Sequence, residues 1–167
     1  MSQSTPDTVR PIGLFDSGEG GLTVARAIAE LLPHEHLVYA CDTAHFPYGP
    51  RPLAQVRAFF LRFMEFFVEQ NCKLVIVACN TATAATMDLL TAGAFPVPAL
   101  GVVQPGAAMA ASASVTGRIG VAATQGTCDS GIYPETIRRL RPEADVVQQA
   151  CPILVIRAAE GVISGPE

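Results

Sequence analysis

Cys79 is the residue whose type and position most favour chemistry in this chain of 167 residues. It follows a short apolar run at residues 74–78 and precedes Asn80, a good N-cap for a helix. A thiol at such a junction faces free backbone N–H groups and the positive end of the helix, which favour the thiolate. A carboxylate nearby, such as Asp16, would raise the thiol pKa instead, and the sequence leaves the balance open. The alternative interpretation is a small buried hydrophobic residue.

Polar residues and glycines follow the other predicted strands as well. The segments are Asp16-Ser17-Gly18-Glu19-Gly20-Gly21, Cys41-Asp42-Thr43, Phe46-Pro47-Tyr48-Gly49, Cys79-Asn80-Thr81-Ala82-Thr83 and Thr124-Gln125-Gly126-Thr127. Ligands of open parallel sheets bind beyond the carboxyl ends of the strands, so we expect these segments to border one site. Turn and capping chemistry would explain each segment alone, but their co-occurrence favours a site. Cys41 is a second candidate thiol, whereas Cys72 precedes a strand and is predicted to be structural.

The residues near Cys79 exclude several kinds of catalysis. A phosphatase loop would need an arginine where Ala85 stands. No histidine follows His45, so only His45 itself could activate the thiol, and only if the fold happened to bring it close. No Gly-Lys-Ser/Thr loop occurs, and the only lysine, Lys73, is predicted at the far end of its strand, away from any pyridoxal site. A thiol, the Asp16 carboxylate, hydroxyls and amides remain. That set suits general acid–base catalysis on a small polar molecule without a cofactor.

Composition bears on the partners of the protein, its cellular compartment and the presence of a metal. The net charge is −4 and there is one lysine, so a nucleic-acid-binding face is not expected. No apolar run reaches the roughly 18 residues of a membrane span, and the N-terminus does not resemble a signal peptide. An odd number of cysteines without a Cys-x-x-Cys pair favours a reducing cytoplasm, and His34 and His36 have no further ligand at a metal-like spacing. We therefore expect a cytoplasmic protein without a metal.

Alternating strands and helices must position these residues. Strands are predicted at residues 12–15, 37–40, 74–78, 97–102, 119–122 and 145–148, and helices at 21–32, 53–71, 81–92, 106–114 and 132–140. Most strand candidates are continuous apolar runs, as expected for parallel strands that are covered on both faces. In the second helix, phenylalanines repeat at helical spacing and are predicted to be core. The order predicts an α/β fold with a doubly wound parallel sheet, in which residues 12–15 and 74–78 are adjacent.

Four segments of the sequence resemble the glutamate racemases of the aspartate/glutamate racemase family. They are residues 12–24, Asp42-Thr43 with Pro47-Tyr48-Gly49, residues 77–83 and Gln149-Ala150-Cys151-Pro152. The resemblance implies a flavodoxin-like three-layer α/β/α domain, one of two similar domains with the active site between them. It also implies cofactor-independent interconversion of L- and D-glutamate, which supplies D-glutamate for peptidoglycan, and a protein that commonly dimerises.

The same resemblance implies roles for particular residues. Cys79 would be one of two thiols acting on opposite faces of the α-carbon. Asp16 and Ser17 would contact the substrate amino group and support that thiol. The remaining substrate-binding residues would be Tyr48, Gly49, Asn80 and Thr81 at the carboxylates, and Thr124 and Thr127 in a loop that faces the substrate.

The chain departs from the family pattern in three ways. The segment Gly-Cys-Thr-His, with the second thiol, does not occur, Ala159 stands where a glutamate is usual, and Gln104 replaces another glutamate. We therefore expect a flexible segment at 1–10, a domain at 11–150 that carries the first half of the active site, and a truncated start of the second domain at 151–167. The low charge content and the apolar residues 153–163 predict self-association through an exposed domain interface. The alternative is a non-catalytic ligand-binding or interaction domain derived from a racemase.

Overall fold

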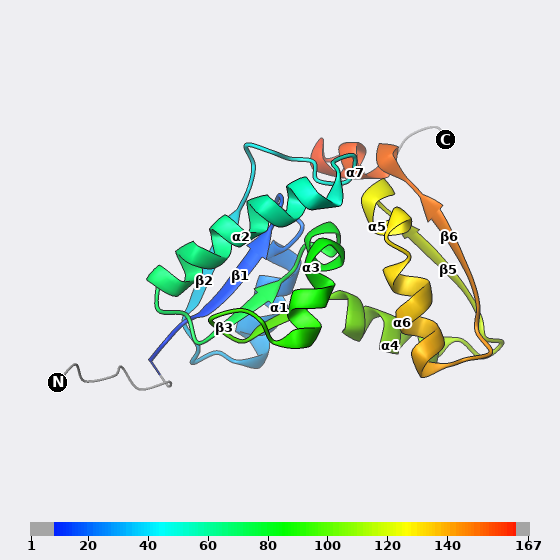
Figure 1. Ribbon diagram of the computed structural model, residues 1–167, viewed down its shortest axis with the longest axis horizontal. Coiled ribbons are helices and arrows are strands. Elements are labelled where there is room, and N and C mark those ends of the chain that lie inside the picture. The colour runs from blue at the N-terminus through cyan, green and yellow to red at the C-terminus, as the bar shows by residue number, and fades with distance from the viewer. Residues whose placement is uncertain (1–8, 163–167) are drawn as a thin grey trace.

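The six predicted strands form two parallel sheets. A computed structural model describes residues 9–162, and the polypeptide alternates strands with helices throughout (Figure 1). The strands are β1 (Ile12–Asp16), β2 (Leu37–Cys41), β3 (Leu74–Val77), β4 (Ala99–Gly101), β5 (Arg118–Ala123) and β6 (Asp145–Ala150). The first sheet has the order β2-β1-β3-β4, and the second pairs β5 with β6.

Helices connect successive strands. They are α1 (Leu22–Leu31), α2 (Leu53–Glu69), α3 (Asn80–Ala92), α4 (Val103–Ala113), α5 (Gln125–Asp129), α6 (Ile132–Leu140) and α7 (Pro152–Ala159). The short α5 lies where the sequence predicts only a loop. Within residues 9–162, no helix is both long and apolar enough to span a membrane.

The α/β class with parallel strands is confirmed, but the strands are divided between two sheets. All five residues of β1 are buried, whereas β5 alternates between exposed and half-buried residues. A strand with that alternation has one covered face, so it does not take the central place that a fully buried strand takes in a doubly wound sheet. The division places β5 and β6 on one side of the molecule and the first sheet on the other (Figure 1).

Two element boundaries differ from the prediction because of prolines. The predicted strand at 97–102 shortens to β4, which begins after Pro98, a residue without a backbone N–H for the ladder. The predicted helix at 106–114 begins earlier, at Val103, because Pro105 falls in the first helical turn, where no N–H partner is needed.

The main core lies between α2, α3 and the first sheet. Phe15 of β1 packs against Phe60 of α2 with ring centroids 5.1 Å apart, and Phe67 is fully buried. The phenylalanine stripe of α2 is therefore core, as predicted. A Cβ at Gly13 would lie 2.6 Å from the Phe67 ring, so the glycine lets α2 approach the strand closely. This packing holds α2 against β1.

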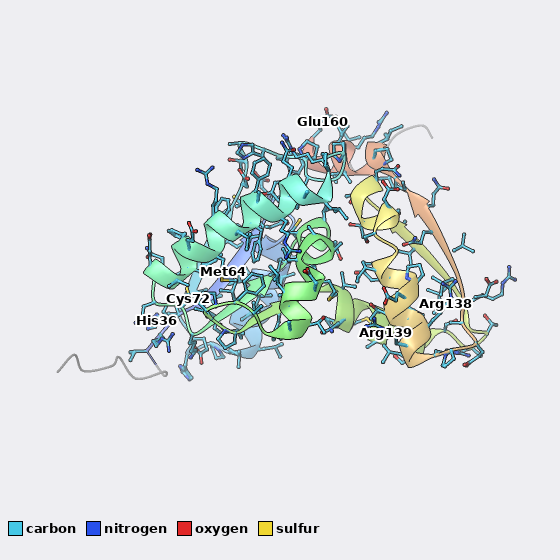
Figure 2. The ribbon with its side chains drawn as sticks, viewed as in Figure 1. His36, Met64, Cys72, Arg138, Arg139 and Glu160 are labelled. Atoms are coloured by element: carbon cyan, nitrogen blue, oxygen red, sulfur yellow. The ribbon has the colours of Figure 1, made fainter. Side chains whose placement is uncertain are left out.

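The limits of the predicted segments fall partly outside the described structure. Residues 1–8 of the predicted flexible segment and residues 163–167 of the predicted start of a second domain lie outside the described residues. Cys72 is fully buried before β3, in the same core cluster as Met64 (Figure 2), which agrees with a structural role. Among residues 9–162, no cluster of three histidine, cysteine or acidic side chains is arranged to hold a metal ion.

Candidate active site

Asp16, the last residue of β1, and Cys79, which follows β3, lie at the carboxyl ends of two adjacent strands. β1 pairs with β3 in parallel, with Phe15 opposite Val77, and the N–H of Ala78 donates to the carbonyl of Phe15 at 2.8 Å. The predicted adjacency of these strands is therefore confirmed. The two side chains line one cleft of about 750 Å³, which is bordered by loops of both sheets and by α7.

The Cys79 side chain caps the N-terminus of α3. Its Sγ accepts a hydrogen bond from the N–H of Ala82 at 3.4 Å, and its thiol donates to Oγ of Ser17 at 3.5 Å. Cys79 is 5% exposed, and the residue has extended backbone angles, as an N-cap requires. The helix terminus predicted from the sequence is thus present, with the sulfur in the place of a capping oxygen.

Burial decides the ionisation of this thiol. Desolvation, followed by the negative charge of Asp16, raises the pKa of Cys79 to about 11. Hydrogen bonds with Ser17 and Ala82 lower the pKa, but they do not offset burial. The sequence left open whether the helix terminus or the Asp16 carboxylate has the larger effect on the pKa of this thiol. Burial and Asp16 together have the larger effect, so the thiol is protonated at neutral pH.

Asp16 is held by the loop that follows β1. Its Oδ2 accepts a hydrogen bond from the N–H of Gly21 at 2.7 Å, and the side chain is mostly buried. A Cβ at Gly21 would lie 2.7 Å from the Cβ of Asp16, so only glycine lets the start of α1 approach this closely. The carboxylate therefore has a fixed position on the wall of the cleft.

Three threonine hydroxyls at the edge of the cleft join α3, which follows the first sheet, to α5, which follows β5. Oγ1 of Thr81, at the start of α3, lies 2.9 Å from Oγ1 of Thr124 and 3.4 Å from Oγ1 of Thr127. Thr124 caps α5 and donates to Thr127 at 3.0 Å. Thr81 and Thr124 line the cleft, whereas Thr127 is fully buried beside them. Thr127 therefore supports the other two and is absent from the cleft wall.

Asn80 is hydrogen-bonded to α6, a helix between β5 and β6. Its Oδ1 accepts a hydrogen bond from the hydroxyl of Tyr133, in α6, at 2.7 Å, which leaves the amide NH₂ of Asn80 as a donor toward the cleft. Tyr133 was not among the predicted site residues. No local sequence signal identifies it, because the contact joins residues 53 positions apart.

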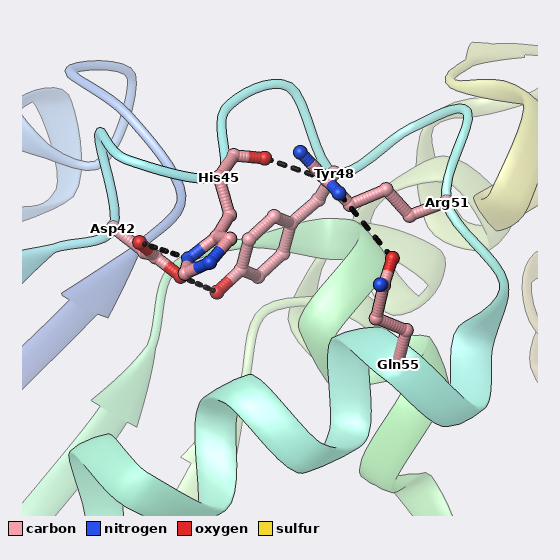
Figure 3. Close-up of polar contacts among 5 residues, drawn as sticks. All are labelled: Asp42, His45, Tyr48, Arg51 and Gln55. Atoms are coloured by element: carbon pink, nitrogen blue, oxygen red, sulfur yellow. Dashed lines mark hydrogen bonds and ion pairs between the residues drawn. The ribbon is translucent and has the colours of Figure 1, made fainter.

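Tyr48 and Gly49 line the cleft, and both are buried. The Tyr48 hydroxyl donates to Oδ2 of Asp42 at 2.7 Å, and Nδ1 of His45 lies 2.9 Å from Oδ1 of the same carboxylate (Figure 3). Burial, followed by the hydrogen bond to Asp42, raises the pKa of Tyr48. Sequence reasoning placed Asp42 at a strand end but gave it no role.

Helix α7 closes one side of the cleft. Val155 and Ala158 line it, whereas Cys151, before this helix, lies outside the lining. Glu160 follows α7 and is exposed (Figure 2). The side chain of Ala159, where the family pattern has a glutamate, lies outside the described structure. In the described part of the cleft, Asp16 and Glu19 are the only acidic residues of the lining.

The fold and the cleft are those of the aspartate/glutamate racemase class. Residues 13–162 match the family model described as Asp/Glu/Hydantoin racemase, and the chain belongs to this family. Glutamate racemase from Symbiobacterium thermophilum is 86% identical over 167 residues, which is 100% of this chain and 60% of that protein. Glutamate racemase from Corynebacterium diphtheriae is 48% identical over 155 residues, 93% of this chain and 58% of that protein.

Solved structures agree with this assignment. A glutamate racemase isoform from Bacillus anthracis matches with a TM-score of 0.84 and 40% identity, over 89% of this chain and 55% of that one. Glutamate racemase from Francisella tularensis, solved in complex with D-glutamate, matches with a TM-score of 0.87 and 33% identity, over 95% of this chain and 59% of that one. The chain thus spans about 60% of the length of the relatives it matches.

Proposed function

We propose that this chain supplies one catalytic half of a glutamate racemase, in which Cys79 exchanges the α-proton on one face of glutamate. The observation that carries the proposal is the position of the Cys79 thiol, at the N-terminus of α3, in contact with Ser17 and on the wall of the cleft. Relatives named glutamate racemase, and a neighbour solved with D-glutamate, support glutamate as the substrate. The product, D-glutamate, would serve peptidoglycan synthesis.

The substrate itself would adjust the thiol. In this proposal Asp16 and Ser17 receive the α-ammonium group, whose positive charge offsets the Asp16 carboxylate. Because that carboxylate raises the pKa of Cys79, its compensation lowers the pKa and makes the thiolate accessible. The thiolate then removes the α-proton of D-glutamate, and the electron pair left on carbon is stabilised by donors around the α-carboxylate.

The remaining polar residues would bind the two carboxylates. The proposed set is Tyr48, Gly49, Asn80, Thr81 and Thr124, with Thr127 beneath them. Asn80 contributes its amide NH₂ and the threonines their hydroxyls. The Tyr48 hydroxyl already donates to Asp42, so its ring shapes the cleft and its oxygen can only accept a hydrogen bond.

Inversion at the α-carbon needs an acid on the face opposite the base. Of the five cysteines, all within the described residues, Cys79 alone lines this cleft. We therefore propose that these 167 residues exchange the α-hydrogen of D-glutamate without inverting it, and that racemisation requires a second thiol from another polypeptide segment. The proposal includes a cytoplasmic location, no cofactor, homo-oligomerisation, and an α/β domain limit at residues 11–150.

The burial of Cys79, which is 5% exposed, favours a second candidate, a non-catalytic ligand-binding domain derived from a racemase. The pKa of Cys79, about 11, keeps the thiol protonated near neutral pH unless a ligand changes its surroundings. Such a domain would bind glutamate in the same cleft and exchange nothing.

Proton NMR in D₂O separates these candidates. We expect slow loss of the α-proton signal from D-glutamate, none from L-glutamate, and no optical inversion. Cys79→Ala should abolish the loss. Cys128→Ala is the matched control, because this half-buried thiol lies outside the cleft lining and its removal should leave the rate unchanged.

Two outcomes would contradict the catalytic proposal. Binding of D-glutamate without any exchange would favour the non-catalytic candidate. Racemisation in both directions that survives removal of Cys41, Cys128 and Cys151 in turn would exclude the proposal that inversion requires a second thiol.

A further inference from the structure

Asp42 is the centre of a side-chain network, and Asp42 itself has no role in the proposed reaction. It follows β2, its N–H donates to the carbonyl of Asp16 at 3.1 Å, and it is 5% exposed. Its Oδ2 accepts the Tyr48 hydroxyl at 2.7 Å, and both of its oxygens lie 2.9 Å from Nδ1 of His45 (Figure 3). A buried carboxylate with several hydrogen bonds fixes the groups that surround it, because leaving any of them unpaired is unfavourable.

His45 is itself anchored on α2. Its ring stacks on Phe59, with centroids 4.0 Å apart and planes inclined by 22°. Its carbonyl accepts a hydrogen bond from Nε of Arg51 at 2.7 Å, and Arg51 also donates to Gln55 of α2 at 3.3 Å (Figure 3). The loop between β2 and α2 is therefore held at its start by the backbone bond from Asp42 to Asp16, and further along by the α2 side chains of Phe59 and Gln55.

The same loop reaches the second sheet through Gly49. The carbonyl of Gly49 accepts a hydrogen bond from the N–H of Gly126, in α5, at 2.8 Å. A Cβ at Gly49 would lie 2.8 Å from the Cβ of Thr124, so the two backbones are in close contact. Any shift of Tyr48 toward solvent would pull Gly49 away from α5 and open the cleft on that side.

We propose that Asp42 and His45 are positioning residues, which through Tyr48 hold Gly49 against α5 and so set the affinity of the cleft for a small dicarboxylate amino acid. The identity of the ligand rests on the proposed function, whereas the docking of the loop does not. Neither residue lines the cleft, so both act through the Tyr48–Gly49 segment.

Two measurements on the full chain test this proposal. Amide hydrogen exchange of Gly126 reports the bond to Gly49, and an NMR titration with D-glutamate gives the dissociation constant. Asp42→Ala should speed exchange at Gly126 and weaken binding by about tenfold, since it removes the acceptor of two side chains. Asp42→Asn keeps an acceptor for Tyr48 and should restore most of the loss. His45→Phe keeps the ring contact with Phe59 and should weaken binding by about threefold.

Asp88→Ala is the matched control, because it removes one carboxylate that pairs with Arg57 on the surface, away from the cleft. The amide of Val75, bonded to Pro98 in the first sheet, reports global opening and should keep its protection in every variant. Equal loss of protection at Val75 and Gly126, or no change at Gly126 beyond that of Asp88→Ala, would overturn the proposal. If Asp42→Ala does not fold, the effect of His45→Phe on exchange at Gly126 and on binding decides.

Failure of the proposed function would look different. If the unaltered chain does not bind D-glutamate, both the substrate and the affinity part of this inference are wrong. Exchange at Gly126 would still decide whether Asp42 and His45 dock the loop.

Discussion

The thiol of Cys79 donates a hydrogen bond to Oγ of Ser17, 3.5 Å away, across the carboxyl ends of two adjacent strands. The pair joins the loop after β1 to the N-terminus of α3, and it connects the candidate proton-transfer group to the residues proposed to receive the substrate amino group. Asp16 is the last residue of β1 and directly precedes Ser17, so the charge that opposes thiolate formation lies next to the residue that contacts the thiol.

Removal of the Asp16 charge should make Cys79 more reactive. Because the carboxylate raises the pKa of Cys79, Asp16→Asn should lower that pKa and increase the thiolate fraction at any pH below it. The alkylation rate of Cys79 by a small iodoacetamide-type reagent, followed by peptide mass spectrometry, measures the change. Asp88→Asn, on an exposed turn of α3, is the control and should leave the rate as it is. A rate for Asp16→Asn equal to that of the control would show that this charge does not govern the thiol.

Ionisation of Cys79 should also make the stability of the fold depend on pH in alkali. The folded pKa, about 11, lies above the ordinary value of 9.0, so between them the unfolded chain releases a proton that the folded chain keeps. The stabilisation is complete below pH 9 and is lost as pH rises toward about 11, at up to about 1.4 kcal/mol per pH unit. Cys79→Ser retains a capping side chain but does not titrate there.

Urea unfolding of both proteins across this pH range measures the difference. We expect the free energy of unfolding of the unaltered chain to fall more steeply than that of Cys79→Ser, because other alkaline groups titrate equally in both. Parallel curves would mean that the Cys79 thiol ionises at the same pH in the folded and unfolded states.

Local patterns predict the strands and the meeting of Cys79 and Asp16, but they do not predict the division into two sheets. Apolar runs identify β1 and β3, and the parallel order brings their carboxyl ends together. The sheet to which β5 belongs depends on which strand it pairs with, here β6. The local sequence of β5 does not indicate that partner. Likewise, whether Thr124 or Thr127 borders the cleft depends on the orientation of α5, a helix that the sequence does not predict.

The contact between Asp42 and Tyr48 was missed for a related reason. Both residues belong to a predicted loop, and the spacing of a carboxylate and a phenol within a loop has no fixed geometry. Only the path of the polypeptide from β2 to α2 brings the two side chains to 2.7 Å.

The threonine link between the sheets should contribute measurably to stability. Thr81→Val preserves the shape of a fully buried side chain but removes the hydroxyl that contacts Thr124 and Thr127. We expect a loss of about 1 to 2 kcal/mol in the free energy of unfolding by urea, since a buried partner loses its hydrogen bond. Thr91→Val, at an exposed position of α3, is the control and should change stability by less than about 0.5 kcal/mol. Equal effects of the two substitutions would show that the link is energetically neutral.

Self-association should depend on α7. This helix exposes Ile153, Leu154 and Ile156 by half or more of their surface, beside the cleft and at the rim of the molecule (Figure 1). Adjacent exposed apolar side chains are uncommon on monomeric proteins, so we expect sedimentation to give a mass that rises with concentration. Leu154→Glu should shift the equilibrium toward monomer because burial of the new charge is costly. Val115→Glu adds the same charge at a loop position remote from α7 and should not. A monomer at all concentrations, or an equal response to both substitutions, would exclude α7 as the contact surface.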